Sequence, residues 1–317
     1  MEQPMNIDIH ADDYALTINT SRDMLKCMKA GKLDSISIVA NTSCFAECMD
    51  MLYEAIPKLP FLPKLSVHVD LVEGLKTFQG ELPEAMVQKT EDGRILLNMT
   101  WGKIYLWSWI LSRKNPISIG IADEVKAQID KCQAVIEKCI GIARENNIPC
   151  TQEGLRIDSH QHSHMIPIVW RGCVKAVEDG NYKIEYIRNS HEPLKVFLDN
   201  KEFKKTYRPV NIVKNRILAL HSKKVDKYCD KNGLERMYLW GLIMSGRMDR
   251  ERVGGLLPAI KEAAQKDNRT LEILFHPGST LPEELNGEVK EEAARDFYLS
   301  EGRRIEMDAV MNCEMHS

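Results

Sequence analysis

The sequence MNIDIHADD at residues 5–13 alternates apolar and polar residues and then ends in two adjacent carboxylates. This pattern predicts a β-strand that has one buried face and delivers polar side chains to the end of a sheet. The next stretch, residues 17–30, has the apolar spacing of a helix and is followed by Gly31, a residue that commonly ends helices. The opening of the chain therefore predicts the first strand and helix of an α/β fold.

The alternation of strand and helix continues along the chain. Up to residue 71 the predicted elements are a strand at 35–40, a helix at 46–55 and a strand at 65–71. This order is typical of a parallel sheet with helices packed against it. A long helical pattern and three more β-like runs follow, at 122–146, 155–160, 184–187 and 271–275. Between the last two runs, the basic stretch 195–227 is predicted to be irregular.

The segment 73–116 interrupts this pattern. It contains four glycines and an aromatic cluster, which are Gly74, Gly80, Gly93 and Gly102, and Trp101, Tyr105, Trp107 and Trp109. We interpret the segment as an insertion that folds over the functional site. A chain of 317 residues that is 44% hydrophobic can bury one large core. We therefore expect a single domain, 1–317, with an insertion or lid at about 73–116.

Composition argues against several classes of function. Lysine and arginine number 43 against 46 aspartate and glutamate residues, and no basic block is present, so nucleic-acid binding is not expected. No apolar run approaches the roughly 18 residues that span a bilayer, and the N-terminus lacks the pattern of a signal peptide. We expect a cytoplasmic protein without membrane contacts. The nine cysteines form no CxxC pair, which predicts reduced thiols rather than disulfides or a zinc knot.

Histidines and aspartates gather where the β-like runs end. The residues at or directly after these runs are Asp12, Asp13, His68, His160, His164 and His276. Functional sites of α/β sheets and barrels lie at the C-terminal ends of strands. The densest group is DSHQHSH at 158–164, in which His162 is the middle histidine. Each residue alone has an ordinary structural explanation, such as a core histidine or a helix N-cap. Their joint position at strand ends indicates a metal site.

Four segments resemble the signature segments of the YdjC/ChbG carbohydrate deacetylases. They are ADDY at 11–14, HVDL at 68–71 followed by Glu73 and Gly74, DSHQHSHMIP at 158–167, and FHPG at 275–278. The resemblance extends from about residue 7 to about residue 307, and the histidine-rich segment is its most specific part. Three positions differ from the usual pattern of that family, with Ala15 in place of glycine, Asp70 in place of asparagine and Ser163 in place of valine.

The resemblance implies a distorted (β/α) barrel of the polysaccharide deacetylase and glycoside hydrolase type. It also implies a hydrolase that removes an N-acetyl group from an amino sugar or oligosaccharide, using a divalent metal ion, Mg or Zn. Carried over by position, the metal ligands are Asp13, His68 and His160. Asp12 is then the general base and His276 the general acid. The residues expected to line the pocket or support the ligands are His162, His164 and Asp158.

Other functions fit parts of the pattern. A metal-dependent phosphoesterase also uses Asp and His at strand ends, but a two-metal centre needs more carboxylates than the sequence places there. A non-catalytic sugar-binding protein would stack sugars on the tryptophans of 101–109 and would need no acid and base. A cysteine-based hydrolase is disfavoured because no cysteine adjoins a strand-end histidine. The expected partner is a small N-acetylated sugar, and the resemblance suggests a homodimer, for which residues 101–110 are one candidate contact surface.

Overall fold

The computed structural model describes residues 6–316. The predicted first strand is present as β1 (Ile7–Tyr14). Met5 of that stretch lies outside the described residues, as do the first and last residues of the expected domain 1–317. The helix predicted after it is α1 (Ile18–Lys29), which begins at Thr17, whose side chain accepts a hydrogen bond from the backbone N–H of Thr20. The first strand and helix expected from the sequence are confirmed.

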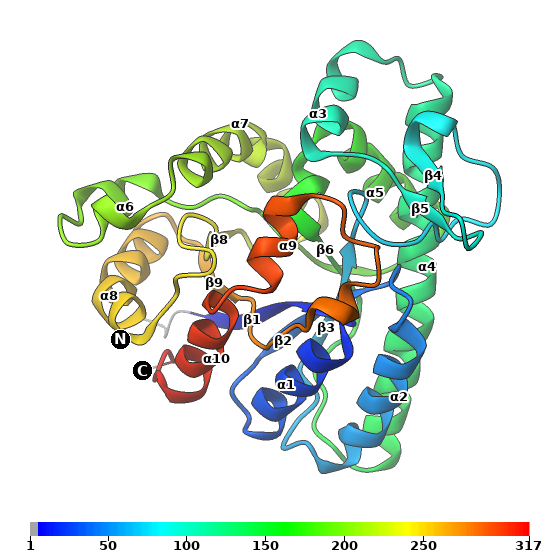
Figure 1. Ribbon diagram of the computed structural model, residues 1–317. Coiled ribbons are helices and arrows are strands. Elements are labelled where there is room, and N and C mark those ends of the chain that lie inside the picture. The colour runs from blue at the N-terminus through cyan, green and yellow to red at the C-terminus, as the bar shows by residue number, and fades with distance from the viewer. Residues whose placement is uncertain (1–5, 317) are drawn as a thin grey trace.

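β1 lies inside a seven-stranded sheet with the order β7-β6-β3-β2-β1-β9-β8, and every pairing in it is parallel. The other strands are β2 (Ser35–Val39), β3 (Lys64–Val69), β6 (Leu155–Ser159), β7 (Ile184–Ile187), β8 (Met237–Trp240) and β9 (Thr270–Phe275). The sheet curls between its edge strands β7 and β8 (Figure 1). The fold is therefore α/β with a distorted, partly open barrel, as the resemblance implied.

Helices surround the curled sheet (Figure 1). Besides α1 they are α2 (Phe45–Ala55), α4 (Pro116–Glu145), α5 (Pro167–Asp179), α6 (Leu194–Asp199), α7 (Pro209–Asn232), α8 (Arg250–Lys266), α9 (Glu292–Tyr298) and α10 (Gly302–Asn312). Short 3₁₀ helices are η1 (Ile56–Lys58), η3 (His160–Met165), η4 (Lys204–Thr206) and η5 (Pro282–Leu285). Because helices cover the parallel strands, residues on both faces of β2, β6 and β8 are buried. Within residues 6–316, no helix combines the length and apolar composition needed to cross a membrane.

The stretch 195–227 is mostly helical, so the prediction of irregular structure there was wrong. It holds most of α6 and α7. The helix α7 begins with Pro209 and is followed by Gly233, which has a φ of 67°. The helical pattern of α7 is weak because its buried apolar positions are few, namely Leu218, Val225 and Cys229. Strand β8 was also not predicted, because its four residues are all buried and show no alternation.

The segment 73–116 forms small elements of its own between β3 and α4. They are η2 (Glu84–Met86), the antiparallel strands β4 (Val87–Lys89) and β5 (Ile95–Leu97), and α3 (Trp101–Ile110). In α3 the rings of Trp101 and Tyr105 stack with their centroids 5.1 Å apart. Tyr105 also meets the ring of His221 on α7 edge-on, at a centroid distance of 6.0 Å. Tyr105 thus connects α3 to α7, and the function of the segment as a lid stays a prediction.

The close packing at the end of β8 can be tested by a substitution at Gly241. Gly241 has a φ of 144°, and a Cβ atom there would lie 2.3 Å from the carbonyl oxygen of Leu274. We expect Gly241→Ala to lower the free energy of unfolding by roughly 2 kcal/mol or more, because both the backbone conformation and the close contact resist a side chain. Urea denaturation of the wild type and the variant measures this difference.

The matched control is Gly254→Ala on α8, where a new Cβ would meet no atom within 4 Å. Alanine is the better helix former by about 0.5–1 kcal/mol, so this variant should be as stable as the wild type or more stable. Equal stability of the two variants would contradict the packing described at the end of β8.

Candidate metal centre

The end of β1 places Asp12 and Asp13 beside the same histidine. Adjacent strand residues normally point to opposite faces, but Asp13 has a φ of 75° and Ala15 a φ of 69°, so the chain turns there. His68 therefore lies near both carboxylates, with Nδ1 3.8 Å from Asp12 Oδ1 and Nε2 3.6 Å from Asp13 Oδ1. Glycine adopts a positive φ without steric cost, which accounts for the usual glycine at the position that Ala15 fills here.

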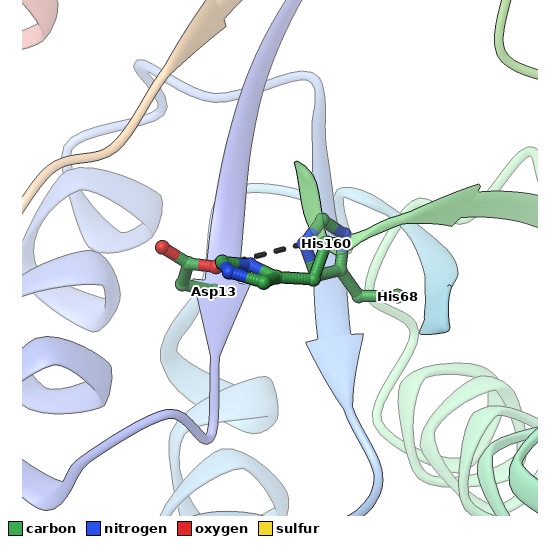
Figure 2. A group of neighbouring side chains, drawn as sticks. All are labelled: Asp13, His68 and His160. Atoms are coloured by element: carbon green, nitrogen blue, oxygen red, sulfur yellow. Dashed lines mark ion pairs between the residues drawn. The ribbon is translucent and has the colours of Figure 1, made fainter. Parts of the chain in front are cut away.

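The structure brings together Asp13, His68 and His160, the three residues that the resemblance implied as metal ligands (Figure 2). Asp13 Oδ1 lies 3.6 Å from His68 Nε2 and 3.5 Å from His160 Nδ1. An ion about 2.0–2.2 Å from each ligand atom holds those atoms roughly 3–3.5 Å apart, so the spacing fits a metal ion. Oδ1 of Asp13 is buried without a hydrogen-bond partner, whereas Oδ2 accepts a bond of 2.9 Å from Arg303 Nη1. The free oxygen is the one that faces the histidines.

The outer nitrogen of each histidine has a partner of its own. Nδ1 of His68 lies 2.6 Å from Asp158 Oδ1, which leaves Nε2 to face Asp13. Nε2 of His160 lies 3.0 Å from the hydroxyl of Tyr298, which leaves Nδ1 to face Asp13. Contacts of this kind fix the ring orientation of metal-binding histidines. The prediction placed Asp158 among the supporting residues, and its contact with His68 gives it such a position.

The cluster attracts positive charge. Burial alone would lower the pKa of His160, but the carboxylates of Asp70, Asp13 and Glu73 outweigh it and raise that pKa to about 10. The pKa of His68 is also raised, because Asp12 and Asp158 outweigh its burial. A buried group of carboxylates that stabilises protonated imidazoles also stabilises a metal cation that replaces the proton on each ligating nitrogen. The electrostatics therefore agree with the geometry.

Next to the cluster, the guanidinium of Arg188 is completely buried and contacts three carboxylates, those of Asp12, Asp158 and Glu272. It donates to both oxygens of Asp12 at 2.8 and 2.9 Å, donates to Glu272 at 2.8 Å, and lies 3.3 Å from Asp158. Burial would raise the pKa values of Asp12 and Asp158, but Arg188 outweighs it, and the pKa of Asp12 falls well below its usual range. Asp12 is therefore a stable carboxylate, and its oxygens are already hydrogen-bonded.

A second group of potential ligands consists of His10, Asp12 and Asp158. His10 Nε2 lies 3.1 Å from Asp12 and 3.5 Å from Asp158. Arg188 already supplies a positive charge to these two carboxylates, so this group does not call for an ion of its own. The group formed by Asp13, His68 and His160 is therefore the candidate site for a metal ion.

His162 and His164 do not join the cluster. Both ring nitrogens of His164 are engaged, Nδ1 with Ser159 Oγ at 2.6 Å and Nε2 with the carbonyl of Arg188 at 2.8 Å. His162 Nδ1 lies 3.0 Å from Ser190 Oγ, and burial lowers the pKa of both histidines. A positive φ at His162 turns the chain within η3, so the three alternating histidines do not project toward one point.

His276 follows β9 and lies at the same end of the sheet. Its backbone N–H donates to Glu306 Oε2 at 2.6 Å, and its Nδ1 lies 3.4 Å from the same carboxylate. The ring packs edge-on against Phe297, with centroids 5.2 Å apart. The side chain is 13% exposed, so part of the ring reaches solvent.

Several residues of the centre were not identified from the sequence. Arg188 directly follows β7, so the strand-end position that singled out the histidines could also have identified it. Arg303 and Tyr298 come from helices near the C-terminus, and no motif marks them. Their contacts with Asp13 and His160 join segments far apart in the sequence, which only the folded chain brings together.

The chain has measurable similarity to known proteins. By fold it is similar to a crystal structure from Enterococcus faecalis V583, of a protein described as a candidate for cellobiose-phosphate cleavage. The TM-score is 0.58 at 15% sequence identity, over 98% of this chain and 92% of the other, which supports the fold alone. No curated protein matches the sequence. The family described as YdjC-like protein matches residues 6–138 and 155–317, which include every predicted site residue. The chain therefore belongs to the YdjC-like family of carbohydrate-processing proteins.

Proposed function

We propose that this protein is a metal-dependent deacetylase that hydrolyses the N-acetyl group of an acetylated amino sugar or oligosaccharide. The observation that carries the proposal is the convergence of Asp13 Oδ1, His68 Nε2 and His160 Nδ1 at the ends of strands in a chain of the YdjC-like family. Two imidazoles and one carboxylate form a common ligand set of catalytic zinc sites, whereas Mg prefers oxygen ligands. Zn is therefore our first choice of ion, with Mg as the second.

A bound ion would polarise the acetyl carbonyl and lower the pKa of a water molecule beside it. The protein residues would provide orientation and proton transfer. Asp12 is the proposed proton acceptor because it adjoins the ligand Asp13 and its low pKa keeps it ionised. Its tight pairing with Arg188 makes it a weak base, so part of its contribution is to hold the site together. His276 is the proposed donor of a proton to the departing amine, because its partly exposed ring follows β9 at the same end of the sheet as the cluster.

The two alternative functions have less support. A two-metal phosphoesterase needs a second ion where Arg188 already pairs with Asp12 and Asp158. A sugar-binding protein without activity has no need for three buried ligand atoms or for a carboxylate behind His68. Metal content and acetate release separate all three functions, because only the deacetylase requires both.

We expect acetate release from N-acetylated sugars to depend on metal. The protein is stripped with a chelator and assayed with diacetylchitobiose and a panel of other N-acetylated sugars, with and without added Zn, Mg, Mn, Co or Ni. Stripped protein should be inactive and should recover activity when one of the ions is returned. If the protein binds one equivalent of metal but releases no acetate from any sugar of the panel, the site belongs to another hydrolytic reaction.

Asp12 and Asp13 should have separable effects. Asp13→Asn removes a ligand charge, so we expect loss of both metal binding and turnover. Asp12→Asn should abolish turnover while metal stays bound, since Asp12 is not among the three clustered ligands. Metal content by atomic spectroscopy and acetate release are measured on both variants, and thermal melting checks that each is folded. Full activity of either variant would refute the role assigned to that residue.

His276 should affect the rate of reaction more than metal binding. His276→Ala removes the proposed proton donor, and a positioned acid or base contributes typically 10²–10⁴-fold to the rate. We expect kcat to fall by about that factor, with one equivalent of metal retained. The comparison variant is His221→Ala, whose ring packs against Tyr105 at the junction of α3 and α7. An unchanged kcat in His276→Ala would assign the donor role to another group.

A further inference from the structure

We propose that Tyr298 and Glu73 position His160 for metal binding, as the counterpart of the Asp158 carboxylate behind His68. The inference rests on the proposed metal centre but not on the identity of its substrate. It assigns a function to a C-terminal helix residue and to a glutamate of the 73–116 segment, neither of which is a ligand of the cluster.

The hydrogen bonds around the Tyr298 hydroxyl determine which nitrogen of His160 carries its proton. The hydroxyl donates to Glu73 Oε2 at 2.8 Å and lies 3.0 Å from His160 Nε2. A hydroxyl has one proton to donate, so in this arrangement the contact with His160 requires Nε2–H as the donor. The neutral imidazole then has its lone pair on Nδ1, the atom that faces Asp13 Oδ1 at 3.5 Å. The chain from Glu73 through Tyr298 thus selects the tautomer that can bind a metal.

Both members of this chain are held firmly. Glu73 is 3% exposed, its backbone N–H donates to Asp70 Oδ1 at 3.2 Å, and its carbonyl accepts a bond of 2.8 Å from Asn41. Tyr298 is 1% exposed, and its ring lies 6.0 Å from that of Phe297 and 5.7 Å from the guanidinium carbon of Arg303. The hydroxyl therefore has little freedom to move away from His160.

In both histidines one ring nitrogen faces Asp13, but different groups contact the other nitrogen. Behind His68 the acceptor is a carboxylate in direct contact, Asp158 Oδ1 at 2.6 Å from Nδ1. Behind His160 the carboxylate of Glu73 lies 4.0 Å from Nε2, which is too far for a hydrogen bond. The Tyr298 hydroxyl contacts both groups and so connects them. Outer contacts of this type commonly change metal affinity by 10–100-fold when they are removed.

The test measures metal affinity, which does not depend on turnover. Tyr298→Phe keeps the ring and removes the hydroxyl, so the apo protein should melt close to the wild-type temperature. We expect its affinity for Zn, measured by competition with a chromogenic chelator, to fall by about 10–100-fold. Glu73→Met should weaken Zn binding in the same range, because the freed hydroxyl can donate to Nε2 and favour the wrong tautomer.

A double variant and a control make the result specific. If Glu73 acts through Tyr298, the double variant should bind Zn no more than about twofold more weakly than the weaker single variant. The control is Tyr182→Phe, which removes a hydroxyl that donates to Asp130 at 2.7 Å outside the centre, and its Zn affinity should equal that of the wild type.

Zn affinity of Tyr298→Phe within twofold of the wild type would overturn the inference, since packing alone would then explain Tyr298. Additive losses in the double variant would overturn the role of Glu73 as part of the chain. If the wild type binds no metal, the proposed metal centre and this inference both fail. If it binds Zn but releases no acetate from any sugar, the deacetylase proposal fails, and the affinity series still decides the role of Tyr298.

Discussion

The buried guanidinium of Arg188 is the interaction on which the rest of the centre depends. It pairs with Asp12 of β1, Asp158 of β6 and Glu272 of β9, and it directly follows β7. Three buried carboxylates without a cation would repel one another, and removing one partner of a buried ion pair typically costs about 3–5 kcal/mol. Because these partners belong to strands across the curled sheet, Arg188 also holds its interior together.

The orientation of the proposed metal ligands follows from the contacts of Arg188 and its carboxylate partners. Arg188 and Ser37 hold Oδ2 of Asp158, which leaves Oδ1 to contact His68 and direct its Nε2 toward Asp13. Since Arg188 also satisfies Asp12, the unpartnered oxygen that remains at the end of β1 is Oδ1 of Asp13. Because Arg188 already pairs with Asp12 and Asp158, the geometry favours one metal ion, at Asp13, His68 and His160, over two.

The C-terminal helices complete the centre from the other side. α10 supplies Arg303 to Asp13 and Glu306 to His276, and Tyr298 at the end of α9 contacts His160. Each of these contacts joins a residue of the last 20 positions to a strand-end residue earlier in the chain. In Figure 1 α10 lies beside α1, near the start of the chain, although it is the last helix. The centre is therefore assembled only when both ends of the chain have folded together.

The sequence by itself determined the α/β class and the first strand, because strand periodicity is a local property. Strand-end positions placed Asp13, His68 and His160 among the candidate site residues, and the resemblance to the YdjC/ChbG deacetylases selected these three as the proposed ligands. Local patterns gave no sign of β8 or α7, because the patterns of these elements are weak. The expectation that His162 and His164 line the pocket or support the ligands stays a prediction. Only the tertiary structure decided that both ring nitrogens of His164 are engaged, that Asp12 is paired with Arg188, and that Tyr298 lies behind His160. Those contacts join distant segments, and a local pattern carries no information about which distant side chain will meet a given atom.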